Sequence, residues 1–491
     1  MSQIVFPSLP DTVLLPFTYT EFDGTGASED LSLNPFITLI PAQMLPTGSA
    51  EPLVPVRPTS VSIANAMFGR GSQAARMCEK YLNANPVTKM LVIPVLDDET
   101  AVAATGTVHF AGHVSTATPV CLYIGGQLAR FGVSSSTTAS AIAIGLRDVI
   151  NALPDMRVIA STEDATLVLT AKNKGECGND LDLRFGYQGE AFPDGVTAVI
   201  TPMAGGAGNP DAAEVVTSMG NDRYHMIAWP WRDQASLVEI KAEMDSRWGP
   251  LRQIDGQLIT VTPGNFVEAV TFSSAHNNKH LSVLASEGTP TPCDEDAAAS
   301  MAILAYYGNQ QPSRGFNTLV IPGVSAPRKY DMFTDFPEKN QGLMEGLSTR
   351  YVDPDGNVCF SKVITTQRLN SLGAEDKAFL SLNSPLTLSY LRYDWNNYLK
   401  LKYPRHMLAS DGDEKLRSPD VPVMTPKQGK AEAVARMNAW IAASLIEGAA
   451  QFEKDLRVAR NARNENRLDW FMRPNLMNQF EVAGTVMRHL V

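Results

Sequence analysis

Apolar residues recur along the chain in two patterns, which predict buried strands separated by helices. Short runs in which nearly every residue is apolar, such as Lys89–Val95, are typical of strands buried on both faces, and Gln257–Thr262 also has a strand-like pattern. Segments with helical spacing, such as 72–83 and Gln234–Trp248, lie between these runs. The same alternation predicts strands at 224–231, 280–285 and 317–322 and helices at 211–219 and 295–307. We therefore expect a largely parallel sheet covered by helices on both faces.

A β-rich segment interrupts this alternation between residues 97 and 204. Its short runs of Thr and Val are separated by Gly turns, and one helical segment falls at 138–153. Because the α/β alternation resumes after residue 205, we interpret the segment as an inserted domain. Exposed loops tolerate insertions, so this domain is expected on the outside of a core built from residues 23–96 and 205–370.

The pattern changes again near residue 371 and predicts an α+β domain over residues 371–478. A helix is expected at 385–398, with Ser384 as its cap, and a long helix at 427–452. Two strands around a polar turn are expected at 456–461 and 467–472.

Both ends of the sequence carry the period-two pattern of β-strands. Chain ends are usually frayed and polar, so we expect the segments 1–22 and 479–491 each to be tied into a sheet. That sheet belongs either to the same chain or to a neighbouring subunit, since strand addition links chains through main-chain hydrogen bonds. The apolar faces of the two arms consist of Val13, Leu15, Phe17, Tyr19, Phe480, Val482, Val486 and Leu490.

Composition and charge argue against several classes of function for this chain. The chain has 491 residues and a net charge of −11, which argues against a nucleic-acid binder that works by phosphate neutralisation. No secretory signal is visible at 1–10, and no apolar run approaches the ~20 residues of a membrane helix. The five cysteines are scattered without a C-x-x-C spacing, which is typical of buried reduced thiols in a protein made in a cytoplasm.

Four features resemble parts of enzyme sites but lack the rest of the chemistry. The glycine loop 205–211 has neither the Lys-Ser/Thr of a P-loop nor the third glycine of a dinucleotide fingerprint, so we favour a domain-junction turn. His276 and His280 have the spacing of helix-borne metal ligands but are interpreted as part of a surface turn. Asp294–Asp296 are expected to cap a helix, and Cys359 has no evident His partner. We assign no catalytic, cofactor-binding or metal-binding residue; an α/β nucleotide-binding enzyme remains an alternative.

Several short motifs follow one another in order along nearly the whole chain. They are 205–211 (GGAGNPD), 247–250 (RWGP), 253–256 (QIDG), 386–392 (LTLSYLR), 404–406 (PRH), 425–427 (TPK), 466–469 (NRLD) and 478–480 (NQF). In their order and spacing they resemble the tail sheath protein of Mu-like contractile bacteriophages.

This resemblance implies a structural protein rather than an enzyme. The implied fold is a multidomain α/β protein: an α/β sheath core with an inserted β-rich domain and an α+β inner domain completed by strand exchange from neighbouring subunits. Six-membered rings of such subunits stack helically around a tail tube, with baseplate and tail terminator proteins as further partners and no cofactor, direct nucleic-acid contact or membrane insertion. The protein would be made and assembled in the host cytoplasm and reside in the virion tail. The same role in a headless phage-derived injection particle is a second possibility.

A cluster of cations stands out in this acidic chain. From 454 to 473 there are six Lys and Arg residues against three acidic ones, a local balance of +3. Contact with an acidic partner such as the tube, a solvated face and ion pairs between subunits are all compatible with this cluster. The candidate tube-facing residues are Lys427, Lys430, Arg436, Lys454 and Arg457.

Overall fold

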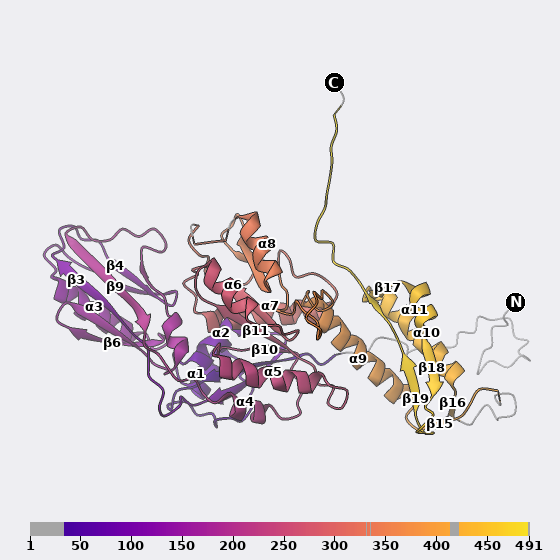
Figure 1. Ribbon diagram of the computed structural model, residues 1–491. Coiled ribbons are helices and arrows are strands. Elements are labelled where there is room, and N and C mark those ends of the chain that lie inside the picture. The colour runs from indigo at the N-terminus through magenta and orange to yellow at the C-terminus, as the bar shows by residue number, and fades with distance from the viewer. Residues whose placement is uncertain (1–33, 330, 334, 413–421, 490–491) are drawn as a thin grey trace, which may run out of the picture. The chain divides into compact units, whose positions relative to one another are not determined.

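The structure, a computed structural model, describes residues 34–329, 331–333, 335–412 and 422–489 (Figure 1). The chain divides into two compact units. The larger unit comprises Pro35–Ser389 and Gln479–Val491, and the smaller unit comprises Met1–Asn34 and Tyr390–Asn478. The predicted amino-terminal strand, with Val13, Leu15, Phe17 and Tyr19, lies outside the described residues.

A seven-stranded sheet forms the centre of the larger unit. Neighbouring strands are parallel except at one edge, where β14 runs antiparallel to β13. The expectation of a largely parallel sheet is therefore confirmed. The strands in spatial order are β14 (Val358–Lys362), β13 (Leu347–Val352), β12 (Leu281–Ala285), β11 (Gln257–Thr262), β10 (Met226–Ala228), β1 (Ile37–Gln43) and β2 (Lys89–Val95).

Helices cover both faces of this sheet. Successive residues of β1 point to opposite faces, so that Leu39 joins one hydrophobic core and Ile40 the other, and both are fully buried. A further helix, α8 (Phe336–Met344), contacts α6 and β13. On the face of Ile40 lie α1 (Val61–Phe68), α2 (Gln73–Ala84) and α7 (Cys293–Gln310); on the face of Leu39 lie α4 (Ala212–Met219), α5 (Gln234–Trp248) and α6 (Phe266–Ser274).

Side-chain caps explain why several of these helices begin where they do. The side chain of Ser72 accepts a hydrogen bond from Ala75 N at the start of α2, and Asp233 accepts one from Ser236 N at the start of α5. Each cap satisfies a backbone N–H that has no partner within the helix.

Residues 97–204, which we call the β-rich segment, form a second part of the larger unit. Helix α3 (Ala139–Ala152) packs against strands of two antiparallel sheets and completes a separate hydrophobic core. A short 3-10 helix, η2, spans Glu176–Asp180. One sheet has the order β6 (Val158–Glu163), β7 (Thr166–Ala171), β3 (Thr105–Gly112) and β9 (Val196–Ala204); the other has the order β5 (Gln127–Phe131), β4 (Val120–Ile124) and β8 (Leu183–Phe185).

The described part of the smaller unit is an α+β structure. Helix α9 (Asn383–Lys402) crosses the boundary between the units, and α10 (Pro426–Ala442) and α11 (Ala449–Asp455) follow. Trp440 and Phe452 lie in its core. The strand pairs are β15 (Met407–Leu408) with β16 (Val423–Met424), β17 (Ile446–Glu447) with β20 (Asn475–Leu476), and β18 (Arg457–Arg460) with β19 (Leu468–Phe471).

Two predicted helices have different bounds. The expected helix 427–452 is broken after α10, because Ser444 (φ 56°) and Gly448 (φ 79°) take left-handed conformations that end a helix. Helix α9 begins at Asn383, so Ser384 lies inside it rather than at its cap.

Two predicted strands are absent from the described residues. The run at 317–322 makes only an isolated bridge between Val320 and Cys359, and Thr318 (φ 68°) interrupts an extended conformation. Residues 479–489 form no strand within this chain.

Candidate interaction surfaces

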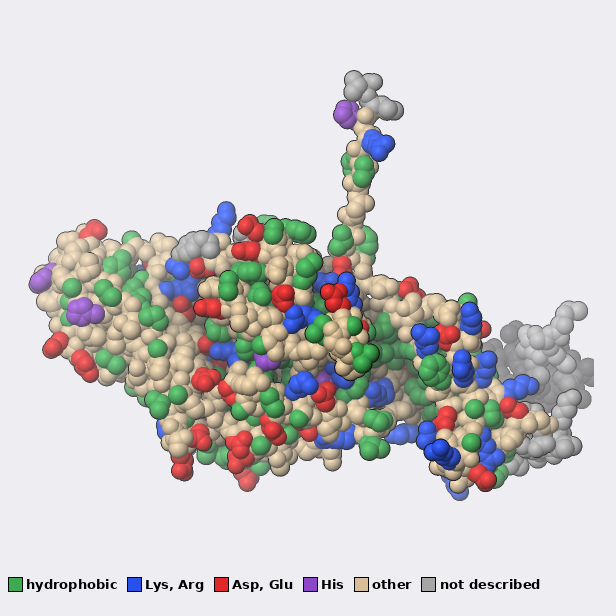
Figure 2. All heavy atoms as spheres, viewed as in Figure 1, with side chains coloured by type: hydrophobic (Ala, Val, Ile, Leu, Met, Phe, Trp, Pro, Cys, Tyr) green, Lys and Arg blue, Asp and Glu red, His purple; other side chains and the backbone are tan. Residues whose placement is uncertain are grey.

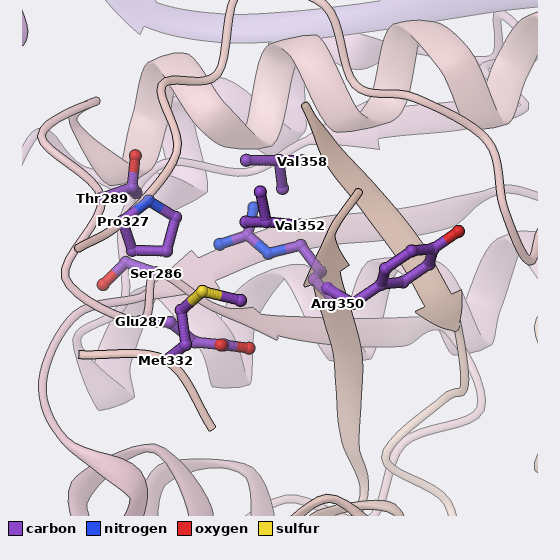
Figure 3. A pocket seen from close by; sticks show the side chains of 9 residues that line it. Ser286, Glu287, Thr289, Pro327, Met332, Arg350, Val352 and Val358 are labelled. Atoms are coloured by element: carbon purple, nitrogen blue, oxygen red, sulfur yellow. The ribbon is translucent and has the colours of Figure 1, made fainter. Parts of the chain in front are cut away.

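A small cavity lies beside the ends of β12 and β13, where α/β folds commonly bind ligands (Figure 3). Its volume is about 10 Å³, which is room for one water molecule and not for a substrate. The most prominent charge in its lining, Arg350, donates to both carboxylate oxygens of Asp296 at 2.8 and 2.7 Å. Burial raises the pKa of the neighbouring Glu287, which accepts a hydrogen bond from Phe333 N. The cavity is therefore part of the packed interior rather than a binding site.

The glycine loop 205–211 uses its polar groups within the protein. Gly206 N donates to Asn179 Oδ1 at 2.8 Å, and Ala207 exchanges backbone hydrogen bonds with Val102. A Cβ on Gly208 would lie 3.0 Å from Ala101 Cα, and Asp211 caps α4 with its carboxylate. Because these amides are already bonded and a carboxylate precedes the helix, the loop does not offer an anion cradle.

We expect no binding heat when ATP or NAD is titrated into the purified protein. The reason is that the loop's amides already pair with Asn179 and Val102. Isothermal titration calorimetry checks this, with Gly208→Asp as the matched variant. Saturable binding by the wild type that disappears in the variant would support the enzyme alternative.

Among the histidine and cysteine candidates, His280 and Cys359 are buried and His276 is half-buried. His280 is fully buried beside Gly256 O and Asp245, so its interpretation as part of a surface turn is wrong. Burial lowers the pKa of both His276 and His280, which keeps them neutral. Burial likewise raises the pKa of the Cys359 thiol and makes it a poor nucleophile. Throughout the described ranges, no three His, Cys, Asp or Glu side chains gather as metal ligands, and no helix is long and apolar enough to cross a bilayer.

The carboxy-terminal segment, residues 479–489, leaves the larger unit as an extended chain with its apolar side chains in solvent. Phe480 and Val482 are each 85% exposed, and Val486 is 84% exposed. At its root, Gln479 Nε2 donates to Ser313 O at 3.0 Å, and Glu481 pairs with Lys362. The predicted fourth apolar residue, Leu490, lies outside the described residues. The segment is thus anchored at its beginning and carries apolar side chains that the described part of the chain leaves exposed.

Four of the five candidate tube-facing cations form a basic surface on the smaller unit. Figure 2 shows Lys and Arg side chains gathered over this part of the chain. Residues 390–478 hold 15 Lys and Arg against 11 Asp and Glu, whereas the remaining residues hold 26 against 41. The basic surface comprises Lys427, Lys430, Lys454 and Arg457, all exposed and none ion-paired with a residue that the structure describes.

Arg436 does not belong to this surface. Its side chain is 2% exposed, and its guanidinium pairs with Asp394 of α9, which is itself fully buried. The indole Nε1 of Trp440 donates to the same carboxylate at 2.6 Å. Arg436 therefore holds α10 against α9, and its assignment to an outward-facing surface was wrong.

Comparison with known proteins identifies the family. The chain is 35% identical over 489 residues to the Mu-like prophage FluMu tail sheath protein of Haemophilus influenzae, which covers 99% of this chain and 100% of that protein. This chain belongs to the tail sheath proteins of Mu-like phages. Residues 205–366 match the phage tail sheath protein central domain, and residues 374–486 match the phage tail sheath C-terminal domain.

Solved structures of sheath proteins are similar over almost the whole length of this sheath protein. The sheath tail protein of Desulfitobacterium hafniense is 12% identical, with 94% of this chain and 100% of that chain covered and a TM-score of 0.47. The helical sheath of the anti-feeding prophage in its contracted state is 10% identical, with 97% and 99% covered and a TM-score of 0.45.

The family accounts for the character of the sites described above. Tail sheath proteins are structural components of phage tails, not enzymes. Among the described residues, the exposed carboxy-terminal segment and the basic surface are the candidate contacts with other proteins. Neither feature depends on a catalytic pocket.

Proposed function

We propose that this sheath protein polymerises helically around a tail tube, in stacked six-membered rings, and that its contraction drives the tube through the host envelope. The observation that carries the proposal is the carboxy-terminal segment, whose described apolar side chains stand in solvent and are covered by no sheet that the structure describes. A subunit that presents one surface to a different surface of the next copy forms a ring if the rotation closes and an open helical polymer if it does not, and the open polymer has the symmetry of a sheath.

Strand exchange is the proposed link between subunits. Phe480, Val482 and Val486 fall at even positions, and Glu481 and Thr485 fall at odd ones, so one face of an added strand is apolar and the other polar. Addition of this strand to a neighbour's sheet edge would satisfy its backbone and bury the apolar face. The amino-terminal arm, with the same alternation, is proposed to act likewise on another neighbour.

The proposed layout follows from these links. Residues 371–478 form the inner domain that the arms 1–22 and 479–491 of neighbours complete. The α/β core of residues 23–96 and 205–370 lies outside it, and the β-rich segment lies outermost. The separate hydrophobic core of the β-rich segment supports its treatment as a domain.

Contraction requires two packings of one subunit and no nucleotide. A trigger at the baseplate would let rings rotate and approach, so that each subunit buries more surface against its neighbours. At about 25 cal/mol per Å², on the order of a few hundred additional Å² per subunit supplies several kcal/mol, multiplied along the polymer. The exchanged arms would keep subunits connected while their bodies rotate.

The basic surface is proposed to face the tube. Its four cations have no ion pairs with described residues, and the charge of residues 390–478 is opposite to that of the rest of the chain. Unpaired cations at an interface attract an acidic partner most strongly at low ionic strength.

Charge reversal tests this assignment. We expect Lys454→Glu combined with Arg457→Glu to weaken binding of the subunit to the tube about tenfold or more, since two attractions become repulsions. Co-sedimentation with purified tube at two salt concentrations measures the effect. Arg130→Glu, at an exposed cation of the β-rich segment, is the matched control and should bind like the wild type. Equal loss in both variants would remove the basic surface from the tube interface.

A further inference from the structure

The first turn of α7 carries three consecutive acidic residues that the protein interior covers. Asp294, Glu295 and Asp296 are 2%, 1% and 0% exposed. Arg157, which precedes β6 in the β-rich segment, donates to both carboxylate oxygens of Asp294 at 2.7 and 2.9 Å. The sequence separation of this pair is 137 residues, and it joins the β-rich segment to the α/β core.

The other two carboxylates pair with arginines of the α/β core itself. Arg76 of α2 pairs with Glu295 at 3.2 Å, and Arg350 of β13 pairs with Asp296 at 2.7 Å. Both guanidinium groups are buried. Each of the three adjacent carboxylates thus pairs with an arginine from a different part of the larger unit. We call the three carboxylates and their partners Arg157, Arg76 and Arg350 the arginine hub.

A second ion pair, whose arginine and aspartate side chains are 16% and 8% exposed, crosses the same junction with the charges reversed. Arg232 of the core donates to both oxygens of Asp180, in η2 of the β-rich segment, at 2.9 and 2.7 Å. Gln73 of α2 adds a hydrogen bond of 2.8 Å to the Asp294 carboxylate. Any rotation of the β-rich segment against the core therefore separates two bidentate ion pairs at once.

We propose that the two ion pairs across this junction, Arg157–Asp294 and Arg232–Asp180, fix the β-rich segment rigidly to the α/β core, so that the two move as one body when sheath subunits rearrange. Only two chain connections join them, near residues 97 and 204, and a domain inserted in this way is by default free to swivel. Swivelling here would leave Arg157 and Asp294 charged and unpaired in the interior, which is strongly unfavourable. The ion pairs Arg157–Asp294 and Arg232–Asp180 remove that freedom and make the β-rich segment an extension of the core.

An exposed ion pair at the same junction provides a matched control. Arg70 of the core donates to both oxygens of Asp155 in the β-rich segment, but their side chains are 54% and 35% exposed. Exposed pairs contribute little because solvent screens them and nothing is left buried when they break. Arg70 and Arg157 therefore offer the same chemistry at the same junction, with burial as the difference.

Thermal unfolding compares the two arginines. We expect Arg157→Met to lower the melting temperature of the full-length subunit by more than about 5 °C, because it leaves Asp294 without its arginine. Arg70→Met should shift it by less than about 1 °C. Equal shifts for the two variants would show that the buried pair has no special part in holding the junction.

Spin-label distances test the rigidity directly. Labels on Val199→Cys in β9 and Val267→Cys in α6 report the distance between the β-rich segment and the core, and the five native cysteines are buried from the label. A narrow distribution is expected in the wild-type background and in Arg70→Met, with a broadened one in Arg157→Met. A broad distribution in the wild-type background overturns the proposal, even if Arg157→Met fails to fold, and so does an unchanged narrow one in a folded Arg157→Met protein. The soluble subunit suffices, so the result is independent of sheath assembly.

Discussion

Deleting residues 479–491 is expected to abolish polymerisation and to leave a folded, soluble subunit. The described residues of this segment contribute nothing to a core of their own chain, so their loss costs little stability. In the polymer the same residues would supply a complete strand to a neighbour, and no other part of the chain replaces it. Electron microscopy should show no cylinders, and circular dichroism should show unchanged secondary structure.

Single substitutions on the two faces of the segment sharpen this result. Val482→Asp places a charge on the apolar face, which strand addition would bury, and is expected to prevent cylinder formation. Thr485→Asp places the same charge on the polar face and should leave cylinders intact. Deletion of residues 1–20 tests the other arm. A truncated protein that still forms long cylinders would contradict strand exchange for that end.

Removal of the Asp394 carboxylate is expected to destabilise the smaller unit. Asp394 is fully buried, and its carboxylate pairs with the guanidinium of Arg436 and accepts a hydrogen bond from the indole Nε1 of Trp440. Asp394→Ala leaves the Arg436 charge buried without its carboxylate, which costs about 3–5 kcal/mol. Chemical denaturation monitored by tryptophan fluorescence should show the smaller unit unfolding at a lower denaturant concentration.

A double variant distinguishes the cost of leaving one buried charge without its partner from the cost of removing both charges. Asp394→Leu with Arg436→Met removes both charges and should be much more stable than either single variant, because no buried charge is left behind. Lys454→Met, which changes an exposed cation of the same unit, should unfold like the wild type. A double variant as unstable as Asp394→Ala would mean that packing, and not the charge, sets the cost.

The local pattern of apolar residues predicted most strands and helices of the α/β core, because buried parallel strands are rich in apolar residues. Lys89–Val95 and Gln257–Thr262 are strands with the predicted bounds, and all of their positions except Lys89 and Leu91 are buried. Strand β1 was missed because Pro41 argues against a central strand. Its pairing with β10 covers only Thr38 and Leu39, so the missing N–H of Pro41 does not interrupt that ladder.

The contacts that determine the roles of the candidate residues involve partners that are far away in the sequence. The sequence near each candidate residue therefore does not predict them. Arg436 looked like one more cation of a basic run, but its partner Asp394 is 42 residues away on another helix. The acidic residues Asp294–Asp296 were expected to cap a helix. They lie instead in the first turn of α7, after the cap position Pro292, and neither their burial nor the arginine that reaches Asp294 from residue 157 was predictable from spacing. The carboxy-terminal strand pattern was visible, but a pattern of apolar residues does not say which chain covers them.

The most direct test is electron microscopy of the purified full-length protein at high concentration, alone and with purified tail tube protein. We expect hollow, transversely striated cylinders, formed by the subunit alone or templated by the tube. Discrete small particles under both conditions would contradict the proposal that this chain polymerises into a sheath.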